Sequence, residues 1–226
     1  MTASSSISTI MAVKNGASYV AASIESVLSQ TIPSTRFLVI DDHSTDETRG
    51  ILERYASEIE VFENEGFGQA AAINLGLKKI NTEFVTFIDH DDLWESKKTE
   101  LSLGLIRNTP NLDVISCGLV NFEGNGSSIS KREFASTRVF GACLFRSSVF
   151  QSVGMLDEDL KNHAIVEWWT RESAHKLKVA AITEPLYLRR VHQSNSGLTR
   201  KEEARSDLFS ILRGRTSLSQ DLEIQS

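Results

Sequence analysis

Residues 84–92 read Phe84-Val85-Thr86-Phe87-Ile88-Asp89-His90-Asp91-Asp92, an apolar run of strand length that ends in three carboxylates and a histidine. A short, nearly continuous apolar run is typical of a strand buried on both faces of a parallel sheet. Open α/β sheets bind their ligands at the carboxyl ends of the strands. The stretch therefore predicts a central strand that presents an acidic turn at a binding edge.

Short apolar runs alternate with helical patterns on both sides of this stretch, which predicts an α/β fold with a mostly parallel central sheet flanked by helices. Strands are expected at 7–13, 37–40, 60–62, 84–88 and 113–117, and later at 139–146, 179–182 and 186–191. Helices are expected at 19–30, 69–80, 96–108 and 164–176, with a further helix ending at residue 55 and a charged one at 201–212. The polar stretch 121–136 is interpreted as a loop.

The composition is that of an ordinary globular protein, with 226 residues of which 40% are hydrophobic and 24% charged. The net charge is −6, so the protein as a whole is not basic, as a nucleic-acid-binding protein usually is. Two cysteines, Cys117 and Cys143, are too few for a disulfide scaffold, and the first residues do not form a signal-peptide pattern. We therefore expect a cytoplasmic protein with buried, reduced thiols and no nucleic-acid partner.

Asp89, Asp91 and Asp92 lie within four residues and repel one another unless a positive group separates them. Mg²⁺ or Mn²⁺ would do so with oxygen ligands, and a nucleotide diphosphate would complete the coordination shell. The alternative is an Asx turn that caps the following helix, in which carboxylates accept hydrogen bonds from backbone N–H groups. Both interpretations stay open on these residues alone.

Asp41 and Asp42 repeat this pattern at the end of the second expected strand. Carboxylates at such an edge can accept hydrogen bonds from a nucleobase N–H or from ribose hydroxyls. The alternative is again an Asx turn, with a helix cap from Asp42 or Ser44.

Six short blocks, taken in order, resemble glycosyltransferase family 2. They are residues 10–16 (IMAVKNG), 24–31 (IESVLSQT), 39–46 (VIDDHSTD), 64–76, 87–94 (FIDHDDLW) and 188–192 (LRRVH). The resemblance covers about residues 7–196 and implies a GT-A fold, a nucleotide-sugar donor, a divalent metal and transfer with inversion. The implied organisation is one domain over 1–200, with a nucleotide-sugar half at about 1–117 and an acceptor half at about 118–200, followed by a C-terminal helix and tail at 201–226.

Carried over residue by residue, the resemblance implies three groups of site residues. The nucleotide would contact Ala12, Val13, Asn15, Asp41, Asp42, Asn74, Asp89 and His90. The metal, Mn²⁺ or Mg²⁺, would be held by Asp89, Asp91 and His192, with Asp91 the expected direct ligand. The diphosphate or acceptor would contact Trp168, Trp169, Arg189 and Arg190. Two positions depart from the family: Ala12 replaces a frequent proline and Lys14 a frequent aromatic residue, and neither does chemistry.

Several of these side chains also have a structural interpretation. Trp168 and Trp169 could form a stacking platform for an acceptor sugar, or could serve as core and pocket wall. An exposed Arg189–Arg190 pair is usually solvated, although guanidinium groups suit diphosphate oxygens. His192 could join the metal shell or form a structural hydrogen bond.

Inverting transfer needs a base that takes the proton of the acceptor hydroxyl. The resemblance places the usual Glu-Asp pair of the family on Ala164 and Ile165, which cannot accept a proton. The nearest carboxylate is Glu167, about 200° further round a helix than Ile165. We expect Glu167 to be the base, with residues 157–159 and His163 as alternatives, Arg171 more as an ion-pair partner than a substrate contact, and a protein without a base as the remaining possibility.

The sequence thus predicts a metal-dependent inverting glycosyltransferase that moves a sugar, from a UDP-sugar first, to a saccharide or lipid-linked acceptor in cell-surface polysaccharide synthesis. A lipid-linked acceptor leaves room for peripheral contact with the inner face of a membrane. The alternative is a nucleotide-sugar-binding protein or partner subunit that has lost catalysis. A dehydrogenase is disfavoured because residues 14–16 do not supply Gly-x-Gly-x-x-Gly, whereas a phosphatase with an aspartate nucleophile stays open.

Overall fold

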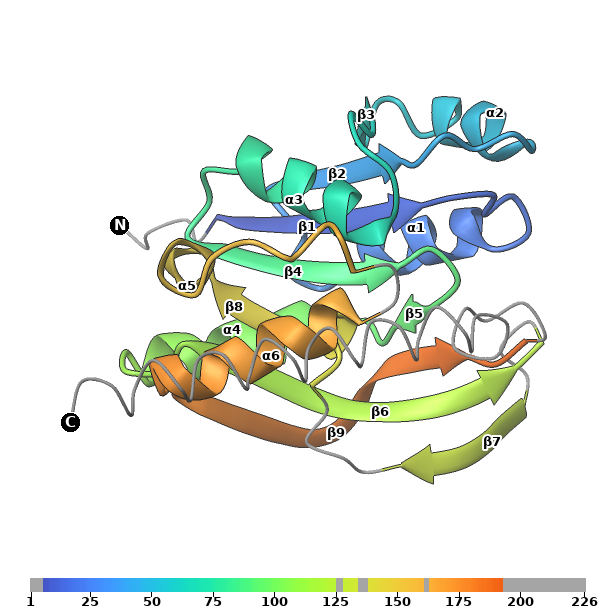
Figure 1. Ribbon diagram of the computed structural model, residues 1–226. Coiled ribbons are helices and arrows are strands. Elements are labelled where there is room, and N and C mark those ends of the chain that lie inside the picture. Colours follow the sequence, from blue (N-terminus) through green and yellow to red (C-terminus); the bar gives the residue numbers. More distant parts are fainter. Residues whose placement is uncertain (1–5, 125–127, 134–137, 161–162, 193–226) are drawn as a thin grey trace.

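The computed structural model describes residues 6–124, 128–133, 138–160 and 163–192 (Figure 1). Within them, nine strands form one sheet in the order β3-β2-β1-β4-β8-β6-β9-β5, and β7 pairs with β6. The strands are β1 (Ile7–Val13), β2 (Arg36–Asp41), β3 (Glu60–Glu63), β4 (Phe84–Asp89), β5 (Leu93–Trp94), β6 (Val114–Glu123), β7 (Ser128–Glu133), β8 (Cys143–Arg146) and β9 (Val179–Arg190). Strands β3, β2, β1 and β4 are mutually parallel, as are β6 and β9, whereas β8 is antiparallel to both of its neighbours.

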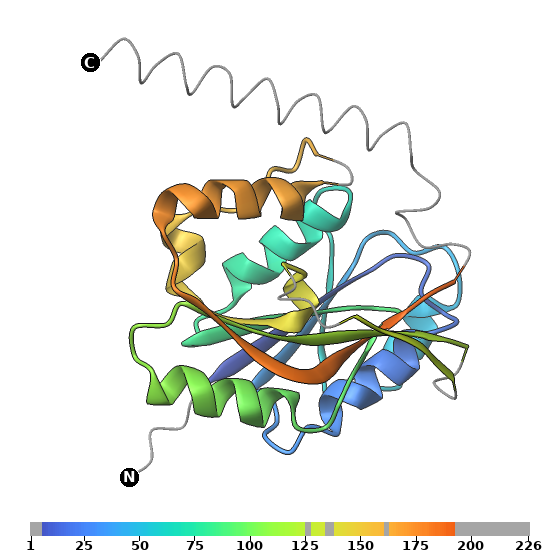
Figure 2. The ribbon, with the colours of Figure 1, turned by 90° about the horizontal axis from the view of Figure 1, so that it is seen from below.

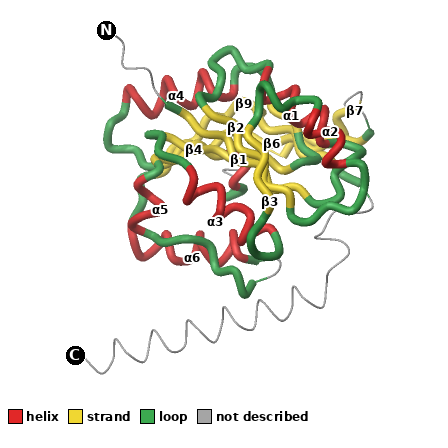
Figure 3. The backbone as a smooth tube through the Cα atoms, turned by 90° about the horizontal axis from the view of Figure 1, so that it is seen from above, coloured by secondary structure: helices red, strands yellow, loops and turns green. Residues whose placement is uncertain are grey.

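Helices cover both faces of the sheet, which confirms the predicted α/β architecture. They are α1 (Val20–Leu28), α2 (Thr48–Glu53), α3 (Gln69–Lys79), α4 (Lys98–Asn108), α5 (Ser148–Ser152) and α6 (Ala164–His175), with a 3-10 turn η1 (Phe140–Ala142). Helices α3, α5 and α6 lie on one face and α1 and α4 on the other, as Figures 2 and 3 show from opposite sides.

The helices pack through faces that their residue spacing dictates. Val20, Ile24 and Val27 recur at helical spacing on α1 and are all buried. Helix α3 approaches β1 closely because residue 76 is glycine, where a Cβ atom would lie 2.7 Å from Cγ2 of Ile10. The first residue of α3, Gln69, lies at the carboxyl edge of the sheet, where its side chain bonds to Asp89 at the end of β4.

Within the polar stretch 121–136, the residues that the structure describes are mostly strand and not the loop that the composition predicts. Strand β6 continues to Glu123, and Ser128–Glu133 pairs with it as β7. A hairpin at the margin of a sheet needs no apolar run, because its strands pair through the backbone. The prediction of a loop was therefore wrong for residues 128–133, because backbone pairing with β6 makes them a strand.

The two late strands that the sequence predicts are one strand, β9. Its register against β6 shifts on either side of Gly118, where a Cβ atom would lie 2.7 Å from the carbonyl oxygen of Glu184. Glycine at this position lets β9 pass β6 without a break and continue to the acidic turn.

The cysteines Cys117 and Cys143 are buried thiols, as predicted. In the part of the chain that the structure describes, no helix has the length and apolarity to cross a membrane. The helix predicted at 201–212 lies outside the described residues.

Candidate active site

Strand register brings the two acidic turns to the same edge of the sheet. Val13 at the end of β1 pairs with Asp41 of β2, and Ala12 pairs with Asp89 of β4. Because β1, β2 and β4 run parallel, their carboxyl ends lie side by side. The acidic ends of β2 and β4 therefore flank the end of β1.

Asp41 is buried, and its carboxylate bonds to the turn that follows β2. Its Oδ1 accepts a hydrogen bond from the Ser44 N–H at 3.0 Å, and its Oδ2 accepts one from Arg49 Nε at 2.7 Å. Arg49 Nη2 also donates to Glu63 on β3 at 2.8 Å. Both oxygens of Asp41 thus bond to protein groups, whereas the expected helix cap from Asp42 or Ser44 does not form at α2, whose N-cap is Glu47.

Asp42 holds the loop that follows β3. Its Oδ1 accepts hydrogen bonds from Asn64 Nδ2 at 2.8 Å and from the Gly68 N–H at 3.0 Å, and Lys14 Nζ lies 3.3 Å from its Oδ2. Burial acts to raise the pKa of Asp42, but these hydrogen bonds and the Lys14 charge outweigh it, so the pKa is lowered. Asp42 is therefore an ionised acceptor at neutral pH.

The loop after β1 is tied to the loop after β2. Asn15 has a left-handed backbone with φ of 52°, and its Oδ1 accepts a hydrogen bond from the Thr45 N–H at 2.8 Å. The Asn15 N–H donates in turn to Ser44 Oγ at 2.9 Å. Val13 is a core residue whose side chain is 1% exposed. The nucleotide contact expected at Val13 stays a prediction, and the buried side chain leaves only the backbone to make it.

Asp89 ends β4 with both carboxylate oxygens in contact with protein groups. Gln69 Nε2 donates to Oδ1 at 2.9 Å, and Tyr187 Oη lies 3.3 Å from Oδ2. Burial, and next the negative charge of Asp91, raise the pKa of Asp89 to about 6. A cation at this turn would be stabilised by the same crowding of negative charge.

His90 turns towards the loop after β1. Its carbonyl accepts a hydrogen bond from Ser23 Oγ at 2.8 Å. A Cβ atom at Gly16 would lie 2.7 Å from Cδ2 of the His90 ring, so glycine leaves room for the imidazole. Burial lowers the pKa of His90 and favours its neutral form.

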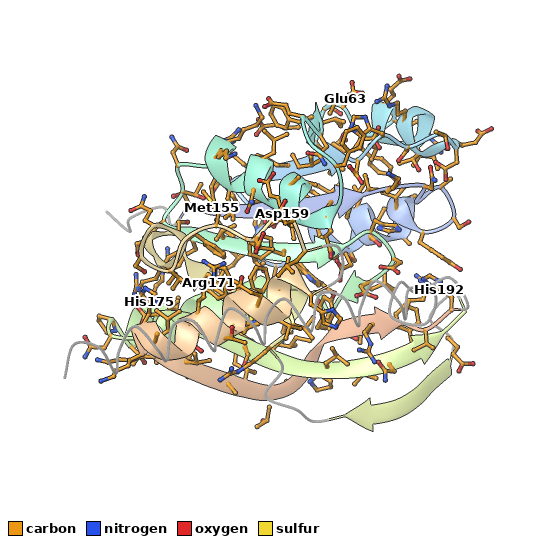
Figure 4. The ribbon with its side chains drawn as sticks, viewed as in Figure 1. Glu63, Met155, Asp159, Arg171, His175 and His192 are labelled. Carbon is orange, nitrogen blue, oxygen red and sulfur yellow. The ribbon has the colours of Figure 1, made fainter. Side chains whose placement is uncertain are left out.

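Asp91 meets His192, which follows the end of β9. Nε2 of His192 lies 2.9 Å from Oδ2 of Asp91, and both side chains are mostly buried. Figure 4 shows His192 at the edge of the sheet where β9 ends. The structure thus brings together two of the three residues predicted to bind a metal.

The donor atoms of this pair fit a divalent cation. A carboxylate oxygen and an imidazole nitrogen both suit Mn²⁺, and the carboxylate suits Mg²⁺. Among the residues that the structure describes, no three His, Cys, Asp or Glu side chains are grouped as a complete metal site. Asp91 and His192 would therefore leave further coordination positions to the oxygens of a bound diphosphate.

A mostly apolar pocket of about 200 Å³ opens beside Asp89. Its walls include Ala12, Gln69, Arg138, Gly141, Ile165 and Val166. Asp89 is the one carboxylate among the described lining residues. Ile165, at the position where the family resemblance places a base, faces this pocket.

Glu167 is not among the described lining residues of this pocket. Its Oε1 accepts a hydrogen bond from Arg171 Nε at 2.7 Å, and Arg171 also donates to the carbonyls of Val153 and Met155. Arg171 and Met155 lie far from His192 (Figure 4). Glu167 is thus the ion-pair partner of Arg171 and is not among the described lining residues of the pocket beside Asp89, a position that does not support the role of base expected of it.

Trp168 and Trp169 are core residues and offer no stacking face to an acceptor. They are 0% and 4% exposed, and both pack against Phe140 and Phe145. Helix α6 lies on the sheet with this tryptophan pair beneath it. The expected acceptor platform is thus corrected to an aromatic core.

Asn74 and Arg190 also have structural roles in place of the expected ligand contacts. The Asn74 amide is buried and bonds to both the N–H and the carbonyl of Leu156. Arg190 is 3% exposed, and its guanidinium lies over the rings of Tyr19 and Phe122. Arg189, by contrast, is exposed at the edge, where its Nε donates to Asn121 Oδ1 at 2.9 Å. Its contact with a diphosphate remains a prediction.

Tyr187 belongs to the site although nothing in the sequence marks it. Its hydroxyl donates to Asp92 Oδ2 at 2.5 Å and lies 3.3 Å from Asp89 Oδ2. The two partners are 95 and 98 residues away along the chain. A local pattern does not report a contact of this range.

Comparison with known proteins agrees with this geometry. A family model described as Glycosyl transferase family 2 matches residues 8–167. An uncharacterised glycosyltransferase of Rickettsia typhi is 29% identical over 221 residues, which cover 87% of this chain and 68% of the relative. The poly(ribitol-phosphate) β-N-acetylglucosaminyltransferase TarP of Staphylococcus aureus is 32% identical over 157 residues, which cover 66% of this chain and 47% of TarP.

Two solved structures share the fold. Residues 1–349 of S. aureus TarS in complex with UDP align with a TM-score of 0.69 and 20% identity, over 82% of this chain and 60% of that one. The mannosyltransferase PcManGT of Pyrobaculum calidifontis, in complex with GDP-Man and Mn²⁺, aligns with a TM-score of 0.63 and 19% identity, over 84% of this chain and 58% of that one. These likenesses confirm the predicted GT-A fold, and the family model spans most of the described chain. The chain belongs to glycosyl transferase family 2.

Proposed function

We propose that this glycosyltransferase moves a sugar from a UDP-sugar to a saccharide or lipid-linked acceptor of a cell-surface polysaccharide, with inversion at the anomeric carbon. One observation carries the proposal: Asp42 and the Asp91–His192 pair lie at the same sheet edge, on either side of the β1 terminus. A nucleotide diphosphate has a base and ribose at one end and a charged diphosphate at the other. At this edge of the sheet, Asp42 offers a hydrogen-bond acceptor for the base or ribose, and the Asp91–His192 pair offers a cation site for the diphosphate.

The relatives support the choice of donor and acceptor class. TarS, which has a similar fold, was solved in complex with UDP, and TarP is named as a glycosyltransferase that acts on poly(ribitol-phosphate). A lipid-linked acceptor would place the reaction at a membrane surface. A UDP-sugar and a surface polymer are therefore the first substrates to test.

The residues of the edge would divide the work as follows. Asp42 accepts hydrogen bonds from the base or ribose, and Asn15 fixes the loop that closes this end of the site. Asp91 and His192 hold a divalent cation, which supplies positive charge to the departing diphosphate. Arg189, exposed at the same edge, adds a guanidinium for diphosphate oxygens.

The acceptor side supports a second candidate, a nucleotide-sugar-binding protein with little or no transfer activity. Ile165 faces the pocket beside Asp89, while Glu167 bonds to Arg171. Neither residue is placed to remove a proton from an acceptor hydroxyl in that pocket. The two candidates share the donor site and differ in turnover.

The deciding experiment incubates the protein and Mn²⁺ with UDP-, GDP- and dTDP-sugars and a panel of saccharide and lipid-linked acceptors. Mass spectrometry detects a glycosylated product, and NMR of its anomeric proton shows inversion or retention. A glycosylated product with inverted configuration supports the proposal. Tight UDP-sugar binding without product from any acceptor favours the binding protein, and a retained configuration contradicts the inverting mechanism.

A further inference from the structure

Tyr187 stands between two carboxylates of the acidic turn. The residue is 0% exposed, and its hydroxyl donates to Asp92 Oδ2 at 2.5 Å while lying 3.3 Å from Asp89 Oδ2. A buried hydroxyl with one proton and two carboxylate neighbours is held in a single place. Tyr187 therefore ties β9 directly to the turn that carries Asp91.

Position 141 must be glycine for this arrangement to form. A Cβ atom at Gly141 would collide with Cε2, Cζ and Oη of Tyr187. Gly141 belongs to the wall of the pocket beside Asp89. The ring of Tyr187 therefore packs against Gly141 of the pocket wall, while its hydroxyl bonds to the acidic turn.

Asp92 completes the connection with its second oxygen. Oδ1 of Asp92 accepts a hydrogen bond from the Arg190 N–H at 2.7 Å. The next two residues, Leu93 and Trp94, pair with β9 through the backbone. Both carboxylate oxygens of Asp92 thus accept hydrogen bonds from residues of β9.

Arg190 adds a third link. Its Nε donates to the carbonyl of Asp91 at 2.8 Å, and its guanidinium carbon lies 4.6 and 4.5 Å from the ring centroids of Tyr19 and Phe122. His192 comes two residues later and reaches Asp91 Oδ2 at 2.9 Å. The end of β9 is thus fixed immediately before the residue that meets Asp91.

We propose that Tyr187 and Asp92 are positioning residues: they hold the end of β9 on the acidic turn and so keep His192 opposite Asp91 for cation binding. The inference rests on the proposed function, since it gives the Asp91–His192 pair a ligand. Partners that orient metal-binding side chains typically change metal affinity by about 10- to 100-fold when they are lost. The nucleotide end of the site, built on Asp42, has no contact with Tyr187 or Asp92 among the hydrogen bonds of the described residues.

The test compares Tyr187→Phe and Asp92→Asn with wild type, using UDP and Mn²⁺ as probes. Tyr187→Phe keeps the ring against Gly141 and removes only the hydroxyl. Two matched controls remove similar groups elsewhere: Tyr55→Phe, whose hydroxyl donates to Glu25 at 2.9 Å, and Asp113→Asn, whose carboxylate accepts the Lys178 N–H at 2.8 Å. Titration calorimetry measures UDP affinity with and without Mn²⁺, and electron paramagnetic resonance measures bound Mn²⁺.

The expected result is that Tyr187→Phe and Asp92→Asn lose about tenfold or more of the affinity that Mn²⁺ adds to UDP binding, as for lost orienting partners of metal ligands. Their UDP affinity without Mn²⁺ should equal that of wild type, and both controls should match wild type throughout. Because the buried Tyr187 is not a metal ligand, its loss tests positioning even if Asp92 itself touches the cation. Wild-type values for Tyr187→Phe would overturn the inference.

A second measurement separates this inference from the proposed function. Amide hydrogen exchange in residues 186–192, measured without ligand, should be faster in both variants because residue 92, which accepts the Arg190 N–H, is no longer held by a hydrogen bond between the Tyr187 hydroxyl and a carboxylate. Unchanged exchange overturns the connection itself. If Mn²⁺ does not change the UDP affinity of the wild type, the proposed function is overturned. The positioning role of Tyr187 and Asp92 is then overturned with it, whatever the amide hydrogen exchange rates are.

Discussion

Nε2 of His192 lies 2.9 Å from Oδ2 of Asp91, although 101 residues separate them in the sequence. Asp91 follows β4, in the parallel half of the sheet, and His192 follows β9, which reaches the same edge by pairing with β6 and β5. Neither half of the chain builds this pair alone. The second half of the chain thus completes the acidic edge that the first half begins.

Asp42→Ala should weaken UDP binding by about 10- to 100-fold, the loss expected for a charged hydrogen-bond acceptor worth about 1.5–3 kcal/mol. The substitution removes the proposed contact to the nucleoside and frees the loop held through Asn64 and Gly68. Titration calorimetry with UDP measures the change.

Asp113→Ala is the control for Asp42→Ala. Asp113 also accepts a backbone hydrogen bond, from Lys178, but it lies at the opposite edge of the sheet, where β6 and β9 begin. It should leave UDP affinity unchanged. Equal affinities for Asp42→Ala and wild type would show that the nucleotide lies elsewhere.

Glu167→Gln should leave turnover close to that of wild type. Glu167 bonds to Arg171 in a half-buried pair, so its loss should lower the free energy of unfolding by about 1 kcal/mol. Steady-state kinetics and urea unfolding measure the two effects separately. A tenfold or larger fall in turnover at unchanged donor affinity would make Glu167 the base after all, since a general base contributes roughly 10²–10⁴-fold.

Ile165→Asp should raise transfer to hydroxyl acceptors. The substitution adds a second carboxylate to a pocket in which Asp89 is the one carboxylate among the described lining residues. Ile165→Asn is the matched control, because it has nearly the same size and polarity but does not take a proton at neutral pH. Initial rates of transfer, measured with one donor–acceptor pair, should be higher for Ile165→Asp than for Ile165→Asn. Equal rates for the two variants would mean that a missing base does not limit the reaction.

Lys98→Met should flatten the pH dependence of stability in alkaline solution. Lys98 is 1% exposed, with its Nζ 3.0 Å from Thr86 Oγ1 and 4.0 Å from the centroid of the Trp94 ring, and burial lowers its pKa to about 8. Between about pH 8 and 10.5 the unfolded chain keeps a proton that the folded protein has lost. The wild type should therefore gain up to about 3 kcal/mol relative to Lys98→Met as pH rises through this range.

Urea unfolding at several pH values measures this difference. Lys97→Met, at the exposed neighbouring lysine, should follow the wild type at every pH. Parallel curves for wild type and Lys98→Met would contradict the burial of the Lys98 ammonium group.

The sequence predicts the carboxyl edge well because the information there is local. Strand β4 is an apolar run that ends in Asp89, and the pattern repeats where β2 ends in Asp41. Because β2 and β4 both pair in parallel with β1, their acidic carboxyl ends lie on either side of the end of β1. The fold class and the place of the acidic turns follow from these runs.

The roles of Tyr187, Arg190 and Trp168 could not be predicted in this way. Each depends on contacts between different elements of the fold: Tyr187 with Asp92, Arg190 between two aromatic rings, and Trp168 of α6 with Phe140. An arginine pair and a tryptophan pair in sequence are compatible with either solvent or core. Only the packing of α6 and the course of β9 decide between the two.

Metal-dependent nucleotide binding at the Asp91–His192 pair is tested most directly by titrating UDP into wild type and Asp91→Ala, each with and without Mn²⁺. Wild type should bind UDP at least about tenfold more tightly with Mn²⁺, since a metal ligand's loss or gain is typically of that order or larger. Asp91→Ala should bind UDP equally with and without Mn²⁺, at the affinity of metal-free wild type. Mn²⁺-dependent binding that survives in Asp91→Ala, or that is absent from wild type, would contradict the assignment of this edge.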